Sequence, residues 1–319
     1  MKQAIPYIFF NFWALATMTA AAANYYVATN GSDAYTSAQT TNLATPWLTI
    51  QKAASVMVAG DTCYIRSGVY RETVTPANSG TATLPITYRP YDNEVVTVSG
   101  AEVVTGWSLH SNGIYRAVFT NVLGDKDQVF VDGVMMNQAR WPNTSLDVSR
   151  PVKAVADSGS YAPTNNPDGT RTGIYTDAAL TQPTGFFDGA KIHLVPGVVW
   201  VAQTGTVTNY VSGSLEFRWK MNGTTNTYAP KMGDPYFLFG LLSLLDTPGE
   251  WFIDSDAKAL YLWPPQNDSP SNHTVEAKRR DYGFDLSGRS YINLQGLRLF
   301  ACAVNSSSTS RGLVLDGLD

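Results

Sequence analysis

The feature that most constrains the fold is an even succession of short strands separated by turn residues. The segments DTCYIR, RETVTP, PITYRPY and EVVTVSG begin at positions 61, 71, 85 and 94, with Gly, Pro or Asn between them. Apolar and polar residues alternate inside each segment, which is the period of a strand with one buried face. The residues predicted to point inward are Cys63, Ile65, Val74, Ile86, Tyr88, Val96 and Val98. This spacing fits a sandwich, a barrel or a coiled solenoid equally well.

The same spacing returns near the C-terminus, in YGFDLSGRSYINLQGLRLFACAV followed by RGLVLDGLD. Phe284 and Leu313 are 29 positions apart, about one turn of a three-sided solenoid of stacked short strands. Before the first strands, the stretch from Thr45 to Gly60 has helical spacing, with Thr45 as N-cap and Pro46 at the first helical position. We expect this helix to cap the open edge of the solenoid.

Between these stretches, over residues 101–278, the sequence pattern changes from evenly spaced short strands to hairpins and loops. Asp132-Gly133 predicts a tight hairpin turn, and GEWFIDSDAKALYLWPP predicts a second hairpin. Residues 151–183 are rich in Asp, Asn, Thr, Gly and Pro, which predicts a long irregular loop. We therefore expect an inserted antiparallel sheet domain, and three of its tryptophans alternate with apolar neighbours as core residues do. These are Trp200, Trp219 and Trp251.

The N-terminus has the pattern of an export signal. Lys2 is followed by the apolar run AIPYIFFNFWALATM and the small-residue run TAAAA, which predicts cleavage near Ala23. We expect a secreted or periplasmic protein that has no membrane segment after cleavage. Only Cys63 and Cys302 are present, both in apolar alternating runs, which favours buried free thiols over a disulfide.

Composition excludes several function classes. The chain of 319 residues holds 22 Lys and Arg against 26 Asp and Glu, with no basic stripe, so no nucleic-acid partner is expected. There is no phosphate loop or dinucleotide fingerprint, and His110, His193 and His273 lack metal-ligand spacing. We expect neither a cofactor nor a metal.

The opening YYVATNGSD…TPWLTIQKAASVMVAGDTCYIRSGVYRE resembles that of exported right-handed parallel β-helix proteins. VFVDGVMMNQARWPN and LLDTPGEWFIDSDAKALYLWPP resemble the β-sandwich inserted into β-helix glycoside hydrolases of the β-xylosidase type. The resemblance implies an all-β fold, namely a right-handed parallel β-helix with an N-terminal capping helix, an inserted β-sandwich and a C-terminus truncated in mid-solenoid. The expected boundaries are signal 1–23, cap and first coils 24–100, insert 101–278, and resumed β-helix 279–319.

Glycoside hydrolysis needs two carboxyl groups facing the sugar. The local pair Asp246 and Glu250 is separated by Thr-Pro-Gly, which favours a turn over a catalytic pair. In this family type the catalytic carboxylates come from later coils, so the resemblance places them beyond residue 319. Asp316 and Asp319 lie on the last coil but are not distinguished from ordinary corner residues.

The predicted substrate-binding residues are Arg140 and Trp141, because Trp rings stack on sugar faces and Arg bonds hydroxyl or carboxylate groups. A structural Trp, with Arg bonding the backbone, is the competing interpretation. The expected function is a glycoside hydrolase acting on a polysaccharide or oligosaccharide. A β-helix polysaccharide lyase is an alternative, with the Lys278, Arg279 and Arg280 run as a weak basic cluster, and so is a non-catalytic glycan-binding solenoid.

Overall fold

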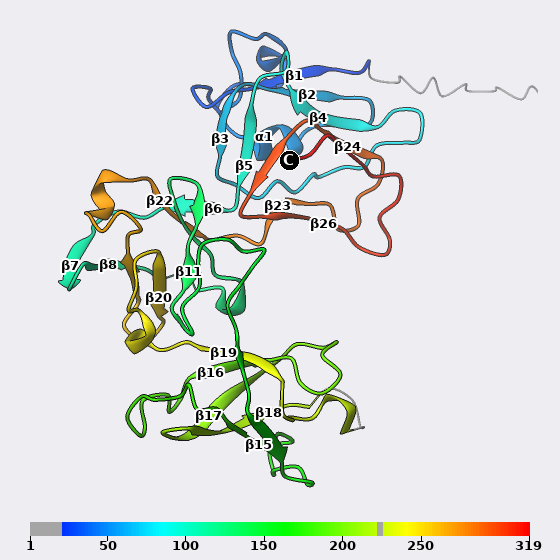
Figure 1. Cartoon of the computed structure of the whole chain (residues 1–319). Coiled ribbons are helices and arrows are strands. Elements are labelled where there is room, and N and C mark those ends of the chain that lie inside the picture. The colour runs from blue at the N-terminus through cyan, green and yellow to red at the C-terminus, as the bar shows by residue number, and fades with distance from the viewer. Residues whose placement is uncertain (1–20, 121, 222–225) are drawn as a thin grey trace, which may run out of the picture. The chain divides into compact units, whose positions relative to one another are not determined.

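The computed structural model describes residues 21–120, 122–221 and 226–319. The chain divides into two compact units, shown in Figure 1. Unit 1 consists of the residues up to Ser99 together with Tyr282–Asp319, and unit 2 is Gly100–Asp281. Strands dominate both units, so the all-β prediction is confirmed. The predicted signal at 1–23 lies almost wholly outside the described residues. No helix in the described part of the chain is long and apolar enough to span a membrane.

Unit 1 is built from parallel strands. Its largest sheet has five strands, all paired in parallel in the order β1-β2-β4-β24-β27. A second sheet has the order β25-β5-β3, and a third pairs β23 with β26. The strands are β1 (Asn24–Val27), β2 (Thr62–Ile65), β3 (Gly68–Tyr70), β4 (Ile86–Pro90), β5 (Val96–Ser99), β23 (Tyr282–Asp285), β24 (Ile292–Gln295), β25 (Arg298–Phe300), β26 (Ala303–Asn305) and β27 (Val314–Asp316).

From β2 onward, consecutive strands of unit 1 belong to different sheets. After β2 the chain turns through Arg66 and Ser67 into β3, which pairs with β5 and not with β2. β2 pairs instead with β1 on one side and β4 on the other, so neighbouring strands of a sheet are separated by a whole circuit of the chain. β24 adds in parallel to β4 after unit 2 has intervened, with Thr87 opposite Asn293.

The core of unit 1 is the set of residues that alternation predicted to point inward. All seven predicted positions from Cys63 to Val98 are fully buried. The part of unit 1 that follows unit 2 adds four more fully buried residues, Phe284, Ile292, Leu294 and Leu297. Phe284 meets Tyr88 edge to face at 5.5 Å, which joins the segments before and after unit 2 in one core.

The predicted helix over 45–60 is too long. The helix α1 (Ile50–Ala54) has five residues, and Thr49 rather than Thr45 is its N-cap, with its hydroxyl accepting from Lys52 N at 3.1 Å. Trp47 instead forms a parallel bridge with Val27, because its backbone bonds both Tyr26 O and Ala28 N. In this stretch the backbone of Trp47 pairs with Val27 instead of forming the helix that the apolar spacing predicts.

Unit 2 contains three sheets. A four-stranded sheet has the order β10-β9-β22-β6 and a five-stranded sheet the order β11-β20-β21-β8-β7. The strands are β6 (Ala101–Val103), β7 (Ser108–Ser111), β8 (Ile114–Val118), β9 (Val129–Val131), β10 (Val134–Met135), β11 (Asn137–Gln138), β20 (Glu250–Asp254), β21 (Ala259–Trp263) and β22 (Val275–Lys278). Asp132 and Gly133 form the predicted turn between β9 and β10, both at positive φ, and β20 and β21 form the second predicted hairpin.

The third sheet of unit 2 has eight strands in the order β12-β19-β16-β17-β18-β15-β14, with β13 also pairing with β19. These strands are β12 (Arg140–Trp141), β13 (Ala154–Val155), β14 (Ser158–Tyr161), β15 (Arg171–Thr176), β16 (Lys191–Leu194), β17 (Gln203–Val211), β18 (Ser214–Trp219) and β19 (Pro235–Phe239). The short helical turns of the chain are η1 (Gln39–Thr41), η2 (Gly124–Lys126), η3 (Asn226–Tyr228), η4 (Leu242–Leu244) and η5 (Pro270–Asn272).

Two sequence predictions for unit 2 are wrong. Residues 151–183 are not one irregular loop, since β14 and β15 pair there as antiparallel strands. Trp200 is not core, because its side chain is 82% exposed, whereas Trp219 and Trp251 are buried. Gly197 and Val199 both have positive φ, and this turn carries the chain out of the sheet just before Trp200.

Both cysteines are free thiols. Cys63 is fully buried in the unit 1 core, and burial raises the pKa of its thiol. Cys302 is half-buried, and its thiol lies 3.4 Å from Val98 O. The expectation of free thiols is confirmed, although only Cys63 is fully buried.

Candidate functional site

Three tyrosines cluster on the outer face of the five-stranded parallel sheet. Alternation points Val27 and Ile65 into the core, so Tyr26 and Tyr64 point outward from β1 and β2, directly opposite each other. Their rings stack at 5.8 Å, and the ring of Tyr91 meets them edge-on at 5.8 and 6.3 Å. All three are half-buried, which leaves aromatic surface on the outside of the sheet.

The turn after β4 is longer than the neighbouring corners. Five residues, 91–95, connect β4 to β5, whereas two connect β2 to β3 and two connect β24 to β25. Glu94 fixes this turn, because its carboxylate accepts from Arg66 Nε at 2.8 and 2.9 Å and from Ser67 N at 2.6 Å. These bonds hold the turn 91–95 against Arg66 and Ser67, the two residues that connect β2 to β3.

A polar cavity of about 440 Å³ opens on the other side of this turn. Gly296 occupies the corresponding turn after β24, the strand next to β4, with positive φ and no side chain to fill the space. The long turn 91–95 therefore lies beside the short turn at Gly296, and the difference in size leaves the cavity between them. The cavity is lined by Arg89, Pro90, Asn93, Glu94, Gln295, Gly296 and Asp316.

The cavity and the tyrosines belong to one outer face. Tyr64 lies opposite Arg89 in the β2–β4 register, and Gln295 lies opposite Asp316 in the β24–β27 register. The Arg66 guanidinium lies 5.3 Å from the Tyr91 ring centroid and joins the aromatic cluster to the turn. Aromatic faces beside planar polar groups can bind a saccharide. We refer to this face as the tyrosine face.

Two carboxyl groups line the cavity of the tyrosine face, but Glu94 is committed to its turn. The hydrogen bond from Arg66 and the bond from the Ser67 amide lower the pKa of Glu94, so it is ionised and bound. Its three bonds make it a positioning residue for the turn. No catalytic carboxylate pair follows from these residues.

The predicted binding residues Arg140 and Trp141 lie on β12 in unit 2. Arg140 is 8% exposed and donates from Nε to Pro142 O at 3.1 Å and from Nη2 to Val152 O, while its guanidinium lies 3.9 Å from the Phe237 ring centroid. Trp141 is half-buried and packs 5.7 Å from Phe187. Both side chains thus have partners within unit 2, and their predicted role in binding stays a prediction.

Glu250 is the more unusual member of the pair Asp246 and Glu250. Its side chain is fully buried, and neither carboxyl oxygen has a hydrogen-bond partner among the described residues. Burial, assisted by the nearby charge of Asp246, raises its pKa to about 8. Asp246 itself accepts from Asn143 Nδ2 at 2.8 Å. Burial of Glu250 thus favours the protonated form of its carboxyl group.

The basic run at the end of unit 2 is paired. Arg280 contacts Glu102, Lys278 lies 3.7 Å from Asp281, and Arg279 stacks over Phe119 at 4.1 Å. His273 bridges Asp132 and Asp268 at 2.7 and 2.8 Å. No group of three or more potential metal ligands occurs within residues 21–120, 122–221 and 226–319.

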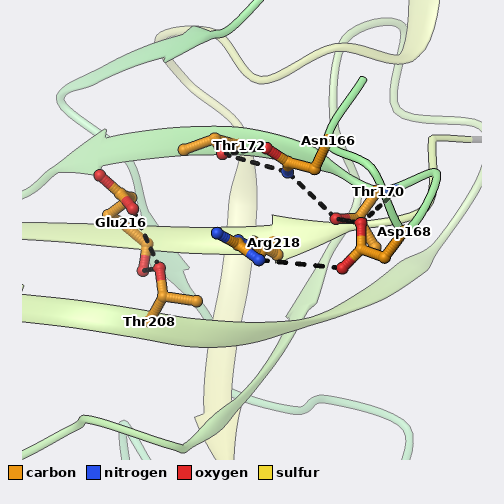
Figure 2. Close-up of polar contacts among 7 residues, drawn as sticks. All are labelled: Asn166, Asp168, Thr170, Thr172, Thr208, Glu216 and Arg218. Carbon is orange, nitrogen blue, oxygen red and sulfur yellow. Dashed lines mark hydrogen bonds and ion pairs between the residues drawn. The ribbon is translucent and has the colours of Figure 1, made fainter. Parts of the chain in front are cut away.

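The outer face of the eight-stranded sheet is polar and internally bonded, as Figure 2 shows. Arg218 of β18 points toward Asp168, with Nη1 3.8 Å from the carboxylate, and Thr170 Oγ1 donates to Asp168 at 2.6 Å. On the neighbouring strand, Thr208 Oγ1 donates to Glu216 at 3.1 Å. Asp168 and Glu216 thus each have a hydroxyl partner on this face.

Sequence reasoning missed the tyrosine face. Its signal was present, because Tyr26 and Tyr64 stand at the outward positions of alternating strands, where polar residues are expected. Their proximity depends on the register between β1 and β2, which are separated by the whole capping segment.

Comparison with known proteins supports the fold. No protein-family model matches the chain. A curated protein of Bacillus subtilis (strain 168), "Uncharacterized protein YwoF", is 41% identical over 109 residues, which is 34% of this chain and 21% of that protein. A solved structure titled "Glycoside hydrolase" is similar with a TM-score of 0.64 and 18% identity, over 87% of this chain and 50% of that one. The structure "The complex structure of XylC with xylose" is matched with a TM-score of 0.44 and 18% identity, over 88% and 36% of the two chains.

The chain spans about a fifth of the curated relative and half of the glycoside hydrolase structure. At 18% identity, the likeness to the latter establishes a shared fold.

Proposed function

We propose that the chain is the N-terminal part of an exported carbohydrate-active protein of the glycoside hydrolase class. In this proposal unit 1 is a right-handed, three-sided parallel β-helix, unit 2 is an inserted β-sandwich, and residues 1–23 are a cleaved signal. The parallel pairing of all five strands of the largest sheet of unit 1 supports a solenoid. The fold likeness to a glycoside hydrolase supports the class.

The observation that carries the proposal is the tyrosine face. A saccharide laid across the outside of β1, β2 and β4 would meet the rings of Tyr26 and Tyr64 and then the cavity beside Glu94. Ring faces contact the C–H surfaces of sugars, while Arg89 and Gln295 can bond hydroxyl groups. The catalytic carboxylates are proposed to lie on coils beyond residue 319, since the cavity offers only Asp316 besides the committed Glu94.

Calorimetric titration with neutral and uronate-containing oligosaccharides tests this function. The chain should bind a saccharide but release no reducing sugar and no unsaturated product. Tyr64→Ala should weaken binding about fivefold, because a stacked ring contributes roughly 1 kcal/mol, and Tyr64→Phe should keep most of the affinity.

Trp200→Ala is the matched control, since Trp200 is a highly exposed aromatic in unit 2. It should leave binding unchanged. Formation of unsaturated product by the chain would favour a lyase, and no binding to any saccharide at millimolar concentration would refute the proposal.

A further inference from the structure

We propose that unit 2 carries a second saccharide site, a groove beside β11 that binds neutral oligosaccharides. This site is separate from the tyrosine face and from Arg140 and Trp141. Two cavities of about 370 and 380 Å³ open in unit 2, and each falls within the size range of small-molecule sites. They adjoin, because both are lined by Asp125, Asp127, Gln138 and Trp251.

Aromatic side chains from two sheets form the wall of this groove. Trp251 and Phe252 come from β20, and Phe239 comes from the end of β19. The indole of Trp251 is 4% exposed and fixed by its N–H, which donates to Met136 O at 3.1 Å. Phe239 and Phe252 are half-buried, so part of each ring remains available to a ligand. The partly open rings of Phe239 and Phe252 can contact a sugar face, whereas the buried Trp251 shapes the groove from within.

Gln138 supplies polar groups along the whole groove, since it lines both cavities. Among the described residues β11 pairs only with β20, to which the flanking amides of Asn137 and Ala139 donate at 3.0 and 2.7 Å. Successive peptide groups of a strand alternate in direction, so the peptide N–H of Gln138 points away from β20. Its carboxamide can both donate to and accept from hydroxyl groups.

An extended peptide is a poorer fit to this edge. Peptide recognition by strand addition depends on a row of main-chain hydrogen bonds, and β11 has only two residues. A saccharide needs ring faces and a few planar polar groups instead, and the groove provides these.

The charges of the groove favour a neutral ligand. Its three lysines all have partners. Lys191 Nζ donates to Thr206 at 3.0 Å, while Lys126 and Lys278 lie 2.6 and 3.7 Å from the Asp281 carboxylate. The carboxylates of Asp125 and Asp256 line the cavities and would repel an anionic sugar. A chain of uncharged sugars avoids this repulsion and can donate hydroxyl hydrogens to the carboxylates.

Backbone amide and indole NMR spectra of the full chain test this site. Neutral xylo- and gluco-oligosaccharides should shift the Gln138 amide and the Trp251 indole signals, and galacturonate oligosaccharides should not. Gln138→Ala should weaken this binding about fivefold at an unchanged melting temperature. Phe252→Leu, which keeps an apolar side chain, should weaken it as well.

Tyr64→Ala and Trp200→Ala are the matched controls. Both should leave the Gln138 and Trp251 shifts intact, so failure at this site is distinguishable from failure at the tyrosine face. The inference is overturned if no neutral saccharide shifts these signals at 10 mM or so. It is equally overturned if Gln138→Ala binds as well as the parent, if uronate chains bind more tightly, or if only extended peptides shift the two signals.

Discussion

Glu94 in unit 1 and Glu250 in unit 2 are the same residue type in opposite environments. Glu94 stands on a surface turn, bonded to Arg66 and the Ser67 amide, and these contacts lower its pKa. Glu250 is fully buried without a hydrogen-bond partner among the described residues, and its pKa rises to about 8. Unit 1 thus uses charge on its outside to hold a turn over a cavity. In unit 2, Glu250 lies in the interior, where burial favours the uncharged form of its carboxyl group.

The largest effect is expected from core substitutions that test whether the two units unfold separately. Phe284→Ala in unit 1 and Phe217→Ala in unit 2 each remove a fully buried ring, and each should cost about 3–5 kcal/mol. Phe284 contacts Tyr88 at 5.5 Å and Phe217 contacts Tyr175 at 5.1 Å, so both losses fall within one unit. Calorimetry should show two transitions, with only the mutated unit's transition lowered. A single transition lowered equally by both variants would contradict separate units.

Glu250 should make unit 2 less stable as the pH rises. Its pKa is raised in the folded state, so the unfolded chain loses the proton first, from the ordinary value of 4.5 upward. Stability should therefore fall between about pH 4.5 and pH 8 and level off above, by up to about 5 kcal/mol, since each pH unit between the two pKa values contributes about 1.4 kcal/mol. Glu250→Gln should flatten this slope in urea unfolding followed across pH.

Glu216→Gln is the control for the glutamate of unit 2, because Glu216 lies on the polar outer face of β18 and bonds Thr208. It should leave the slope unchanged. An equally steep slope in Glu250→Gln would mean that Glu250 is not the titrating group.

Alternation along the sequence predicted the core of unit 1 because it depends only on local period. Each residue from Cys63 to Val98 that should point inward is buried, since a strand offers two faces and the apolar residues occupy one. The same rule failed at Trp200, where positive φ at Gly197 and Val199 takes the chain out of the sheet. Alternation cannot reveal such a turn, because Val199 is not a residue type that favours positive φ.

The pairing between strands far apart in the sequence could not be predicted from local sequence patterns. Thr87 and Asn293 lie opposite each other although 206 positions separate them, and the cavity of the tyrosine face exists only because of that register. The environments of Arg140 and Glu250 also depend on contacts between elements far apart in the chain. The sequence left a ligand-facing Arg140 and an Arg140 bonded to the backbone as alternatives, and the structure has the second; it gave no sign that Glu250, at the start of its strand, would be fully buried.

Glu94 should respond to pH in the opposite direction. Its pKa is lowered in the folded state, so its contribution is present above the ordinary value of 4.5 and is lost as the pH falls through the folded pKa. At acidic pH the amides of residues 91–95 should exchange hydrogen faster while the core strands stay protected. Glu94→Gln should show fast exchange of this turn already at neutral pH, together with weaker saccharide binding on the tyrosine face. Unchanged exchange in that variant would show that Glu94 does not hold the turn.

The smallest effect is expected on the polar face of the eight-stranded sheet. Asp168 and Arg218 are about half exposed and 3.8 Å apart, and exposed pairs at such distances contribute little to stability. Thr170 rather than Arg218 is the main cause of the lowered pKa of Asp168, so removing Arg218 leaves the carboxylate bonded. Arg218→Ala should therefore change neither the melting temperature nor the binding of any saccharide measurably. A clear loss of binding in this variant would place a ligand on the polar face of unit 2 around Arg218, whose contacts Figure 2 shows. Saccharide binding would then not be limited to the tyrosine face and the groove beside β11.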